Sequence, residues 1–412
     1  MQTQLADFIR DTPEGREADA ILRKCVHCGF CTATCPTYQV LGDDLDSPRG
    51  RIYLMKRVLE GAEVSGRTRL HLDRCLTCRA CETTCPSGVR YGRLVDIGRE
   101  VVERRTRRGP WDWLKRSVLS YGLPRTRLFG FFLRLGQRVR PLAPGGLKRS
   151  IPEKTQTNTA WPAPRHSRKM LVLAGCVQPA LAPSINAAAA RVLDRLGISL
   201  IEARNEDGRA AGCCGGIRFH LNRHEAGRDD MRALIDAWWP YLEQGVEAIV
   251  ITASGCGVTV KDYAHLLAHD PAYRDKAARI SALARDLSEV VPADFPQIRS
   301  HGKVAFQSPC SLQHGQQIRG RVESLLARAG FQLAPVRDAH LCCGSAGTYS
   351  ILQPAIAGEL RARKLGALQE GKPAAIATAN IGCLAHLQAE SNVPVRHWIE
   401  LVDEALGRRI SG

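Results

Sequence analysis

The chain has 412 residues, of which 44% are apolar and 6% aromatic, so it is long enough for two or three domains with their own cores. Its 16 cysteines stand in a chain far longer than the usual secreted disulfide scaffold. The N-terminal residues show no signal peptide, and no apolar run approaches the roughly 18 residues of a membrane-spanning helix. We therefore expect a cytoplasmic protein with reduced thiols, most of them metal ligands.

The net charge of +17 is concentrated in one segment of the chain. Residues 104–149 contain 13 Lys or Arg and one acid, Asp112, so this segment carries +12 of the total. The rest of the chain is nearly balanced. The excess is thus a local feature, and we expect no nucleic-acid partner.

The first elements in chain order are two compact motifs of the form C-x2-C-x2-C-x3-C-P. Bacterial ferredoxins use this spacing for [4Fe–4S] clusters, and the fourth cysteine of each motif binds the other cluster. The sequence therefore predicts two [4Fe–4S] clusters with crossed ligand sets. Cluster 1 takes Cys25, Cys28, Cys31 and Cys85. Cluster 2 takes Cys35, Cys75, Cys78 and Cys81.

Zinc is the alternative metal for these motifs. Zinc sites favour two C-x2-C pairs with a longer spacer, and they need no duplicated group of four cysteines followed by proline. Two neighbouring clusters conduct electrons but catalyse no reaction by themselves. We expect residues 1–103 to form a mostly helical, ferredoxin-like module with two clusters.

A basic, aromatic connector follows at residues 104–167 and ends in a Pro-rich linker. Its aromatic side chains could enter a bilayer interface while Lys and Arg meet anionic head groups. Packing against partner subunits is an equal alternative, because interfaces also concentrate aromatic residues and Arg. The aromatic residues are Trp111, Trp113, Phe129, Phe131 and Phe132.

The remainder of the chain is an internal duplication, with halves at residues 168–300 and 301–412. Four cysteines recur about 130 residues apart, and each half alternates apolar runs with helical segments. This order predicts α/β halves with parallel sheets, whose ligands gather beyond the carboxyl ends of the strands. The first half contains Cys176, Cys213, Cys214 and Cys256. The second half contains Cys310, Cys342, Cys343 and Cys383.

Three interpretations of these eight cysteines stay open. Soft thiolates at strand ends suit a further iron–sulfur cluster in one or both halves. The cysteines could instead be buried apolar residues, since free Cys is among the most buried residue types. A redox-active thiol or disulfide pair is the third interpretation, although adjacent Cα atoms lie only about 3.8 Å apart, below the usual disulfide range.

Longer segments resemble the iron–sulfur subunits of bacterial glycolate oxidases over nearly the full chain. They are C-V-H-C-G-F-C-T-A-T-C-P-T-Y-Q (25–39), S-P-R-G-R-I-Y-L (47–54), H-L-D-R-C-L-T-C-R-A-C-E-T-T-C-P-S-G-V-R-Y (71–91), T-A-S-G-C-G (252–257), A-H-L-C-C-G-S-A-G-T-Y (339–349), T-A-N-I-G-C (378–383) and V-R-H-W-I-E-L-V (395–402). The resemblance implies an oxidoreductase complex with two FAD-containing subunits that oxidise glycolate, and also D-lactate, in glyoxylate metabolism. This chain would lie peripherally on the inner face of the cytoplasmic membrane and pass electrons from flavin toward quinone.

The chain departs from the C-C-G domain family at two positions. That family has a further cysteine after the last one of each half, where this chain has Thr259 and His386. Four thiolates per half suffice for an ordinary [4Fe–4S] cluster, but a five-cysteine cluster is in doubt. His386 is a candidate extra ligand, although a lone histidine is more often a hydrogen-bonded residue.

No G-x-G-x-x-G loop is present, so we expect no catalytic residue here and a flavin-bearing partner for substrate oxidation. The alternatives are an iron–sulfur subunit of a lactate or glycerol-3-phosphate dehydrogenase, a thiol or disulfide reductase with the C-C-G region as active site, and a scaffold that only ties flavin subunits to the membrane.

Overall fold

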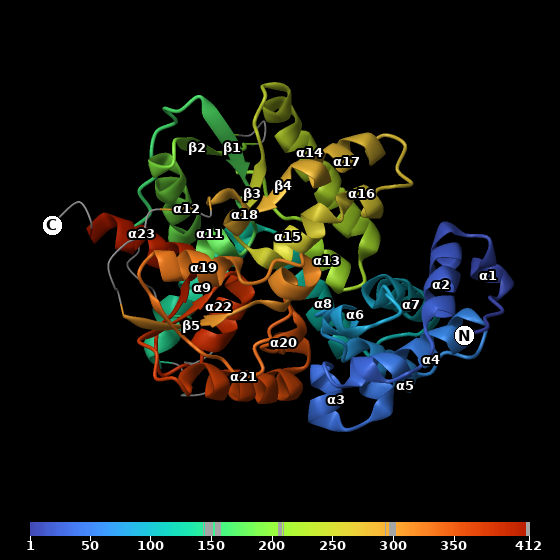
Figure 1. Ribbon diagram of the computed structural model, residues 1–412. Helices are drawn as coiled ribbons and strands as arrows, with labels where there is room; N and C mark the ends of the chain where they lie inside the picture. Colours follow the sequence, from blue (N-terminus) through green and yellow to red (C-terminus); the bar gives the residue numbers. More distant parts are fainter. Residues whose placement is uncertain are drawn as a thin grey trace.

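The computed structural model describes the whole chain except residues 143, 145–150, 153–157, 205–207, 209, 293, 296–301 and 409–412. The chain forms three parts (Figure 1): a helical N-terminal module, a pair of connector helices, and a duplicated α/β region that lies directly beside the N-terminal module. The predicted boundary at residues 300 and 301 lies outside the described residues, as does much of the predicted linker.

The N-terminal module is built from short helices, as the sequence predicts. Thr12, Ser47 and Ser65 cap three of them by accepting a bond from a backbone N–H of the first turn, and proline stands near the start of two. Its elements are α1 (Asp7–Arg10), α2 (Pro13–Lys24), η1 (Phe30–Thr32), α3 (Pro36–Leu41), η2 (Asp44–Asp46), α4 (Pro48–Leu59), α5 (Gly66–Asp73), α6 (Ala80–Thr84) and α7 (Tyr91–Arg105).

Helices α2, α4 and α7 enclose an apolar core that includes Leu22, Met55 and Leu94, none of them accessible to solvent. The first cysteine loop begins at the end of α2, and the second follows α5. The core thus fixes the loops relative to one another, which a two-cluster module needs.

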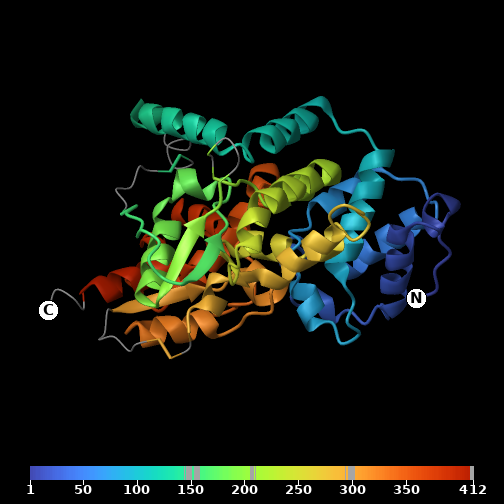
Figure 2. The same cartoon turned by 90° about the horizontal axis from the view of Figure 1, so that it is seen from above.

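The connector forms α8 (Pro110–Gly122), α9 (Thr126–Val139) and the short η3 (Arg140–Leu142). Figure 2 shows α8 and α9 along one edge of the molecule, outside the two sheets. Among the described residues, no helix has the length and apolarity needed to cross a bilayer.

The first half contains a four-stranded parallel sheet in the order β2-β1-β3-β4. The strands were expected from three apolar runs, but the short fourth strand, A-R-D, was not. The elements are β1 (Arg168–Val172), α11 (Gln178–Leu181), α12 (Ser184–Arg195), β2 (Ile198–Glu202), α13 (Gly216–His220), α14 (His224–Glu243), β3 (Ile249–Ile251), α15 (Ser254–Lys261), α16 (Tyr263–Leu266), α17 (Arg274–Leu283), β4 (Ala284–Asp286) and α18 (Leu287–Val290).

The second half repeats this topology with the order β6-β5-β7-β8, again fully parallel, which confirms the predicted duplication. The elements are β5 (Lys303–Gln307), the π-turn η4 (Ser311–Gly315), α19 (Arg321–Arg328), β6 (Gln332–Ala334), α20 (Tyr349–Leu352), α21 (Pro354–Gln369), β7 (Ala375–Thr378), α22 (Ile381–Gln388), β8 (Val395–His397) and α23 (Trp398–Arg408).

The two halves share one hydrophobic core. It joins Val172 and Ile185 of the first half to Phe306 and Trp398 of the second. Helices α12 and α23 lie against each other, and an ion pair of 2.7 Å between Arg191 and Asp403 crosses the contact. The duplicated region is therefore one packed unit.

Candidate iron–sulfur centres

The four cysteines assigned to cluster 1 line one cavity in the N-terminal module. In the loop between Cys25 and Cys31, the backbone of His27 and Gly29 is left-handed, with φ of 54° and 88°. Two such residues curl the loop so that consecutive cysteines face the same space. Cys28 is exposed, and Val26 and Phe30 beside it are 68% and 61% exposed, so this cavity reaches the surface.

The four cysteines assigned to cluster 2 line a neighbouring cavity. The second motif repeats the curl at equivalent positions, because Thr77 and Arg79 have φ of 53° and 60°. Cys81 borders both cavities, so they are adjacent. Apart from Cys81, which lines both, each cavity brings together the cysteines of one predicted set.

Hydrogen bonds surround the thiols of the second cavity. The Tyr91 hydroxyl donates to Cys75 Sγ over 3.6 Å and the Thr77 amide over 3.4 Å, while Thr37 Oγ1 lies 3.3 Å from Cys35 Sγ. Bonds to sulfur favour the thiolate and, in a cluster, the reduced state. Cysteine, tyrosine and threonine side chains thus form one polar lining within an otherwise buried site.

The thiols of both cavities fit a metal cluster chemically. Burial raises the pKa of Cys31 to about 11 and lifts the pKa values of Cys78 and Cys81 well above the ordinary thiol value. Such thiols lose their protons at neutral pH only when a positively charged centre binds them. Four soft donors around each cavity match iron–sulfur chemistry.

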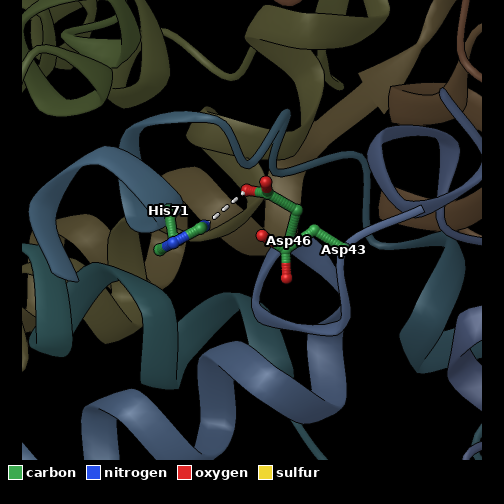
Figure 3. A group of neighbouring side chains, drawn as sticks. All are labelled: Asp43, Asp46 and His71. Atoms are coloured by element: carbon green, nitrogen blue, oxygen red, sulfur yellow. Dashed lines mark ion pairs between the residues drawn. The ribbon is translucent and has the colours of Figure 1, made fainter. Parts of the chain in front are cut away.

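A buried ionic network is centred on Asp46, and Figure 3 shows the Asp43, Asp46 and His71 side chains. Asp46 is fully buried, and its carboxylate lies 3.2 Å from Arg51, 3.1 Å from His71 and 2.8 Å from Arg74. With Asp43 nearby, these side chains have the arrangement of a cation site. Two guanidinium groups already neutralise the Asp46 carboxylate, so the group is a structural ion-pair network.

This network positions a cluster-2 cysteine. The Asp46 carbonyl accepts bonds from Thr37 Oγ1 at 2.9 Å and from Cys35 Sγ at 3.7 Å. The Arg51 guanidinium, 1% exposed, donates to Thr37 Oγ1 over 3.1 Å. The sequence reasoning missed Asp46 and Arg51 as supporting residues. Their signal was a pair of opposite charges five positions apart beside the first cysteine motif.

The first-half cysteines also come together. Hydrogen bonding to Cys213, together with burial, raises the pKa of Cys176, and the thiols of Cys214 and Cys256 continue this chain of contacts. We call the four residues the first-half set: Cys176, Cys213, Cys214 and Cys256. Cys256 lies in the first turn of α15 and not at the end of β3, because the helix begins at Ser254.

The second-half cysteines form an equivalent group. Cys310 Sγ lies 3.8 Å from Cys342 Sγ, and Cys343 contacts both Cys342 and Cys383. We call the four residues the second-half set: Cys310, Cys342, Cys343 and Cys383. All sixteen cysteines of the chain are free thiols in the structure.

The two residues at the position of the fifth cysteine point to backbone groups. His386 Nε2 lies 3.3 Å from the Ala357 carbonyl, and burial lowers the pKa of His386 to about 4. The Thr259 hydroxyl donates to the Gly255 carbonyl over 3.4 Å within its own helix. Both side chains therefore have partners within the protein fold.

Comparison with known proteins agrees with this architecture. A 4Fe-4S dicluster domain matches residues 21–89, and a cysteine-rich domain matches residues 170–261 and 304–388. These matches place iron–sulfur clusters among the cofactors of the chain.

Whole-chain relatives narrow the family further. The chain is 53% identical to the glycolate oxidase iron–sulfur subunit of Escherichia coli, over 98% of this chain and 99% of the relative. It is 28% identical to a probable glycolate oxidase iron–sulfur subunit of Bacillus subtilis, over 95% of both chains. Lactate utilization protein A of Geobacillus kaustophilus is 25% identical over 53% of this chain and 90% of its own. The chain therefore belongs to the family of glycolate oxidase iron–sulfur subunits.

Proposed function

We propose that this chain conducts electrons from two FAD-containing subunits of a glycolate-oxidising complex toward quinone. Cys25, Cys28, Cys31 and Cys85 would hold cluster 1, and Cys35, Cys75, Cys78 and Cys81 would hold cluster 2. The observation that supports this most is the pair of adjacent four-cysteine cavities, one of which reaches the surface. Each cluster, when bound, supplies a centre that accepts and releases one electron.

The exposure of the residues around the two cavities supports an order in which electrons would pass through the clusters. The exposed loop at Val26, Cys28 and Phe30 offers an apolar contact for a flavin subunit. Around the second cavity, Cys35, Cys75 and Cys81 are buried and Arg51 belongs to the lining. Electrons would enter at cluster 1 and continue to cluster 2, and glycolate oxidation to glyoxylate would occur on the flavin partners.

A thiol or disulfide reductase fits the structure less well. Cys342 and Cys343 are 3% and 1% exposed, and Cys213 and Cys214 are also buried. A thiolate that attacks a disulfide must reach its sulfur atom, and buried thiols with raised pKa values are unreactive.

Iron and sulfide analysis of the anaerobically purified chain tests the proposed function. We expect about eight irons and eight sulfides from the two ferredoxin motifs, or about twelve of each if one further set is filled. Reduction with dithionite should give an EPR signal of two interacting [4Fe–4S] clusters. Zinc in place of iron, with no acid-labile sulfide, would exclude electron conduction.

We further propose that the connector helices α8 and α9 attach the complex to the inner surface of the membrane. Ten of the 18 exposed large apolar side chains in the described residues lie on this segment. Arg and Lys surround them, so apolar and cationic groups share one surface, as interfacial helices require. The ten residues, which we call the α8–α9 surface, are Trp111, Trp113, Leu114, Val118, Tyr121, Phe131, Phe132, Leu135, Val139 and Leu142.

Replacing Phe131 and Phe132 by Ser should weaken binding of the whole complex to vesicles that contain anionic lipid. Burying one Phe contributes about 1.5–3 kcal/mol, so the double substitution should lower the partition coefficient at least about tenfold. Ile351→Ser is the control, because Ile351 is 53% exposed but lies on α20. Unchanged vesicle binding together with loss of the flavin subunits would assign the surface to those subunits.

A further inference from the structure

The second-half set packs against the loop of residues 75–81, which carries three of the cluster-2 cysteines and is called the cluster-2 loop below. Leu76 and Cys78 of that loop belong to one small apolar cluster with Cys310, Cys342 and Tyr349. Residues more than 230 positions apart in the sequence therefore share a buried contact. The segment from Leu76 to Cys78, between the first and second cysteines of the second motif, is the part of this loop that packs with these thiols.

Hydrogen bonds hold this contact in place. Thr83 Oγ1 lies 3.0 Å from Nδ1 of His314, a residue of the π-turn that follows Cys310. His314 Nε2 lies 2.9 Å from the His340 carbonyl, two residues before Cys342. The Tyr349 hydroxyl donates to the Arg74 carbonyl over 3.0 Å. The second-half set is thus tied to the ferredoxin-like motif from two sides.

The first-half set has different neighbours. Cys214 and Cys256 pack in an apolar cluster whose described members all come from residues 171–284. The N-terminal module meets this half through ion pairs instead, from Arg79 and Arg93 to Asp262 at 3.0 and 2.9 Å. No cluster-2 cysteine belongs to the apolar cluster around the first-half set, within the described part of the chain.

Charge separates the two sets in the same sense. Lys364 is 4% exposed, its Nζ donates to the Asp338 carbonyl over 2.8 Å, and its positive charge lies near the thiols of Cys343, Cys342 and Cys310. Ile235 stands at the same spacing after the first cysteine pair. Next to the first-half set lies Asp230 instead, an acid that opposes a thiolate at Cys213 and is itself paired with Arg218 at 2.7 Å. A buried cation favours an anionic thiolate-bound centre, and a neighbouring acid disfavours it.

We propose that the second-half set, and not the first-half set, holds the iron–sulfur centre that exchanges electrons with cluster 2, across the apolar cluster that Cys78 shares with Cys310 and Cys342. This inference rests on the proposed function. In each transfer one electron leaves the centre held by the cluster-2 cysteines and enters the centre held by the second-half set, and no bond is made or broken.

Two matched double variants of the full-length chain test the inference. Cys342→Ser with Cys343→Ser should remove about four irons and four sulfides per chain, because serine replaces soft ligands of one cluster. It should also slow the spin relaxation of reduced cluster 2, which loses a paramagnetic neighbour. Cys213→Ser with Cys214→Ser should leave both the iron content and the relaxation at wild-type values.

The outcomes distinguish this inference from the proposed function. If the first-half variant loses the irons and the relaxation effect, or if the wild-type chain contains only the eight irons of the two motifs, the inference is wrong and electron conduction through clusters 1 and 2 stands. Absence of iron from the ferredoxin motifs would overturn both. Should either double variant fail to fold, Cys310→Ser and Cys176→Ser form a milder matched pair with the same expected contrast.

Discussion

Replacing Cys78 by Ser should abolish electron transfer from glycolate to a quinone analogue in the assembled complex. Cys78 is one of four cysteines around the second cavity, and a serine hydroxyl is a poor substitute for a soft thiolate ligand. About four irons per chain should be lost, while the EPR signal of cluster 1 remains. The rate should fall by more than about a hundredfold, because one member of a series path is missing.

Cys28→Ser should lower the rate of electron transfer to the same extent, but in the EPR spectrum the signal of cluster 1 should be lost instead of that of cluster 2. Cys28 is exposed in the loop of the first cavity, so its loss should remove cluster 1, leave the cluster-2 signal and disturb the fold little. Two substitutions in two cavities with one shared kinetic result indicate a series path. The flavin subunits should still reduce a soluble dye directly in both variants.

Thr77→Ser is the matched control for Cys78→Ser. It places serine in the same loop, next to the ligand, and keeps the hydroxyl that accepts a bond from Arg99 over 3.0 Å. Iron content and rate should remain near wild type. If Cys28→Ser and Cys78→Ser also retain the wild-type rate, the chain is a scaffold for the flavin subunits and the electrons travel elsewhere.

The cysteine spacing predicted the cluster module well because its information is local. Left-handed residues at 27 and 29, and again at 77 and 79, let each short loop aim its thiols at one point. The fourth cysteine of each motif can reach the cavity of the other motif as soon as the two motifs lie side by side. This arrangement accounts for both cavities. The duplication was visible for a similar reason, since apolar runs and cysteines repeat in the same order.

Other features depend on contacts that no spacing reveals. The strands β4 and β8 have three residues each, and charged residues within them hide their pattern. The common core forms because α12 meets α23 across the duplicated halves, and the apolar cluster shared by Cys78 and Cys310 joins residues far apart in sequence. His386 was a candidate ligand by position, yet its imidazole bonds to a backbone carbonyl. Only the tertiary structure reveals these strands, these long-range contacts and the hydrogen-bond partner of His386.

Arg51→Met should destabilise the N-terminal module by about 3–5 kcal/mol, the usual cost of breaking a buried ion pair by removing one partner. Arg51 and Asp46 are 1% and 0% exposed and lie 3.2 Å apart. The substitution leaves the Asp46 carboxylate with His71 and Arg74 and removes the bond from Arg51 Nε to the His71 carbonyl at 2.7 Å. Hydrogen exchange of the α4 and α5 amides should report this loss, because it measures the free energy of local opening.

Arg49→Met provides a control that differs chiefly in burial. Arg49 pairs with Asp44 at 2.9 Å, two residues from the buried pair on each side, but these side chains are 37% and 49% exposed. An exposed pair contributes at most about 1 kcal/mol, so exchange in α4 and α5 should change little. Equal effects of the two substitutions would mean that burial of the Asp46 network does not stabilise this module.

Arg51→Met should also lower the midpoint potential of cluster 2. The Arg51 guanidinium lines the second cavity close to the thiols of Cys75 and Cys35, and its positive charge favours the more negative, reduced state of a bound cluster. Arg49 lines the first cavity, so Arg49→Met should shift the potential of cluster 1 instead. A redox titration followed by EPR separates the two clusters. Arg51 would then have two roles. Its ion pair with Asp46 stabilises the loop of Cys35, and its positive charge makes cluster 2 easier to reduce.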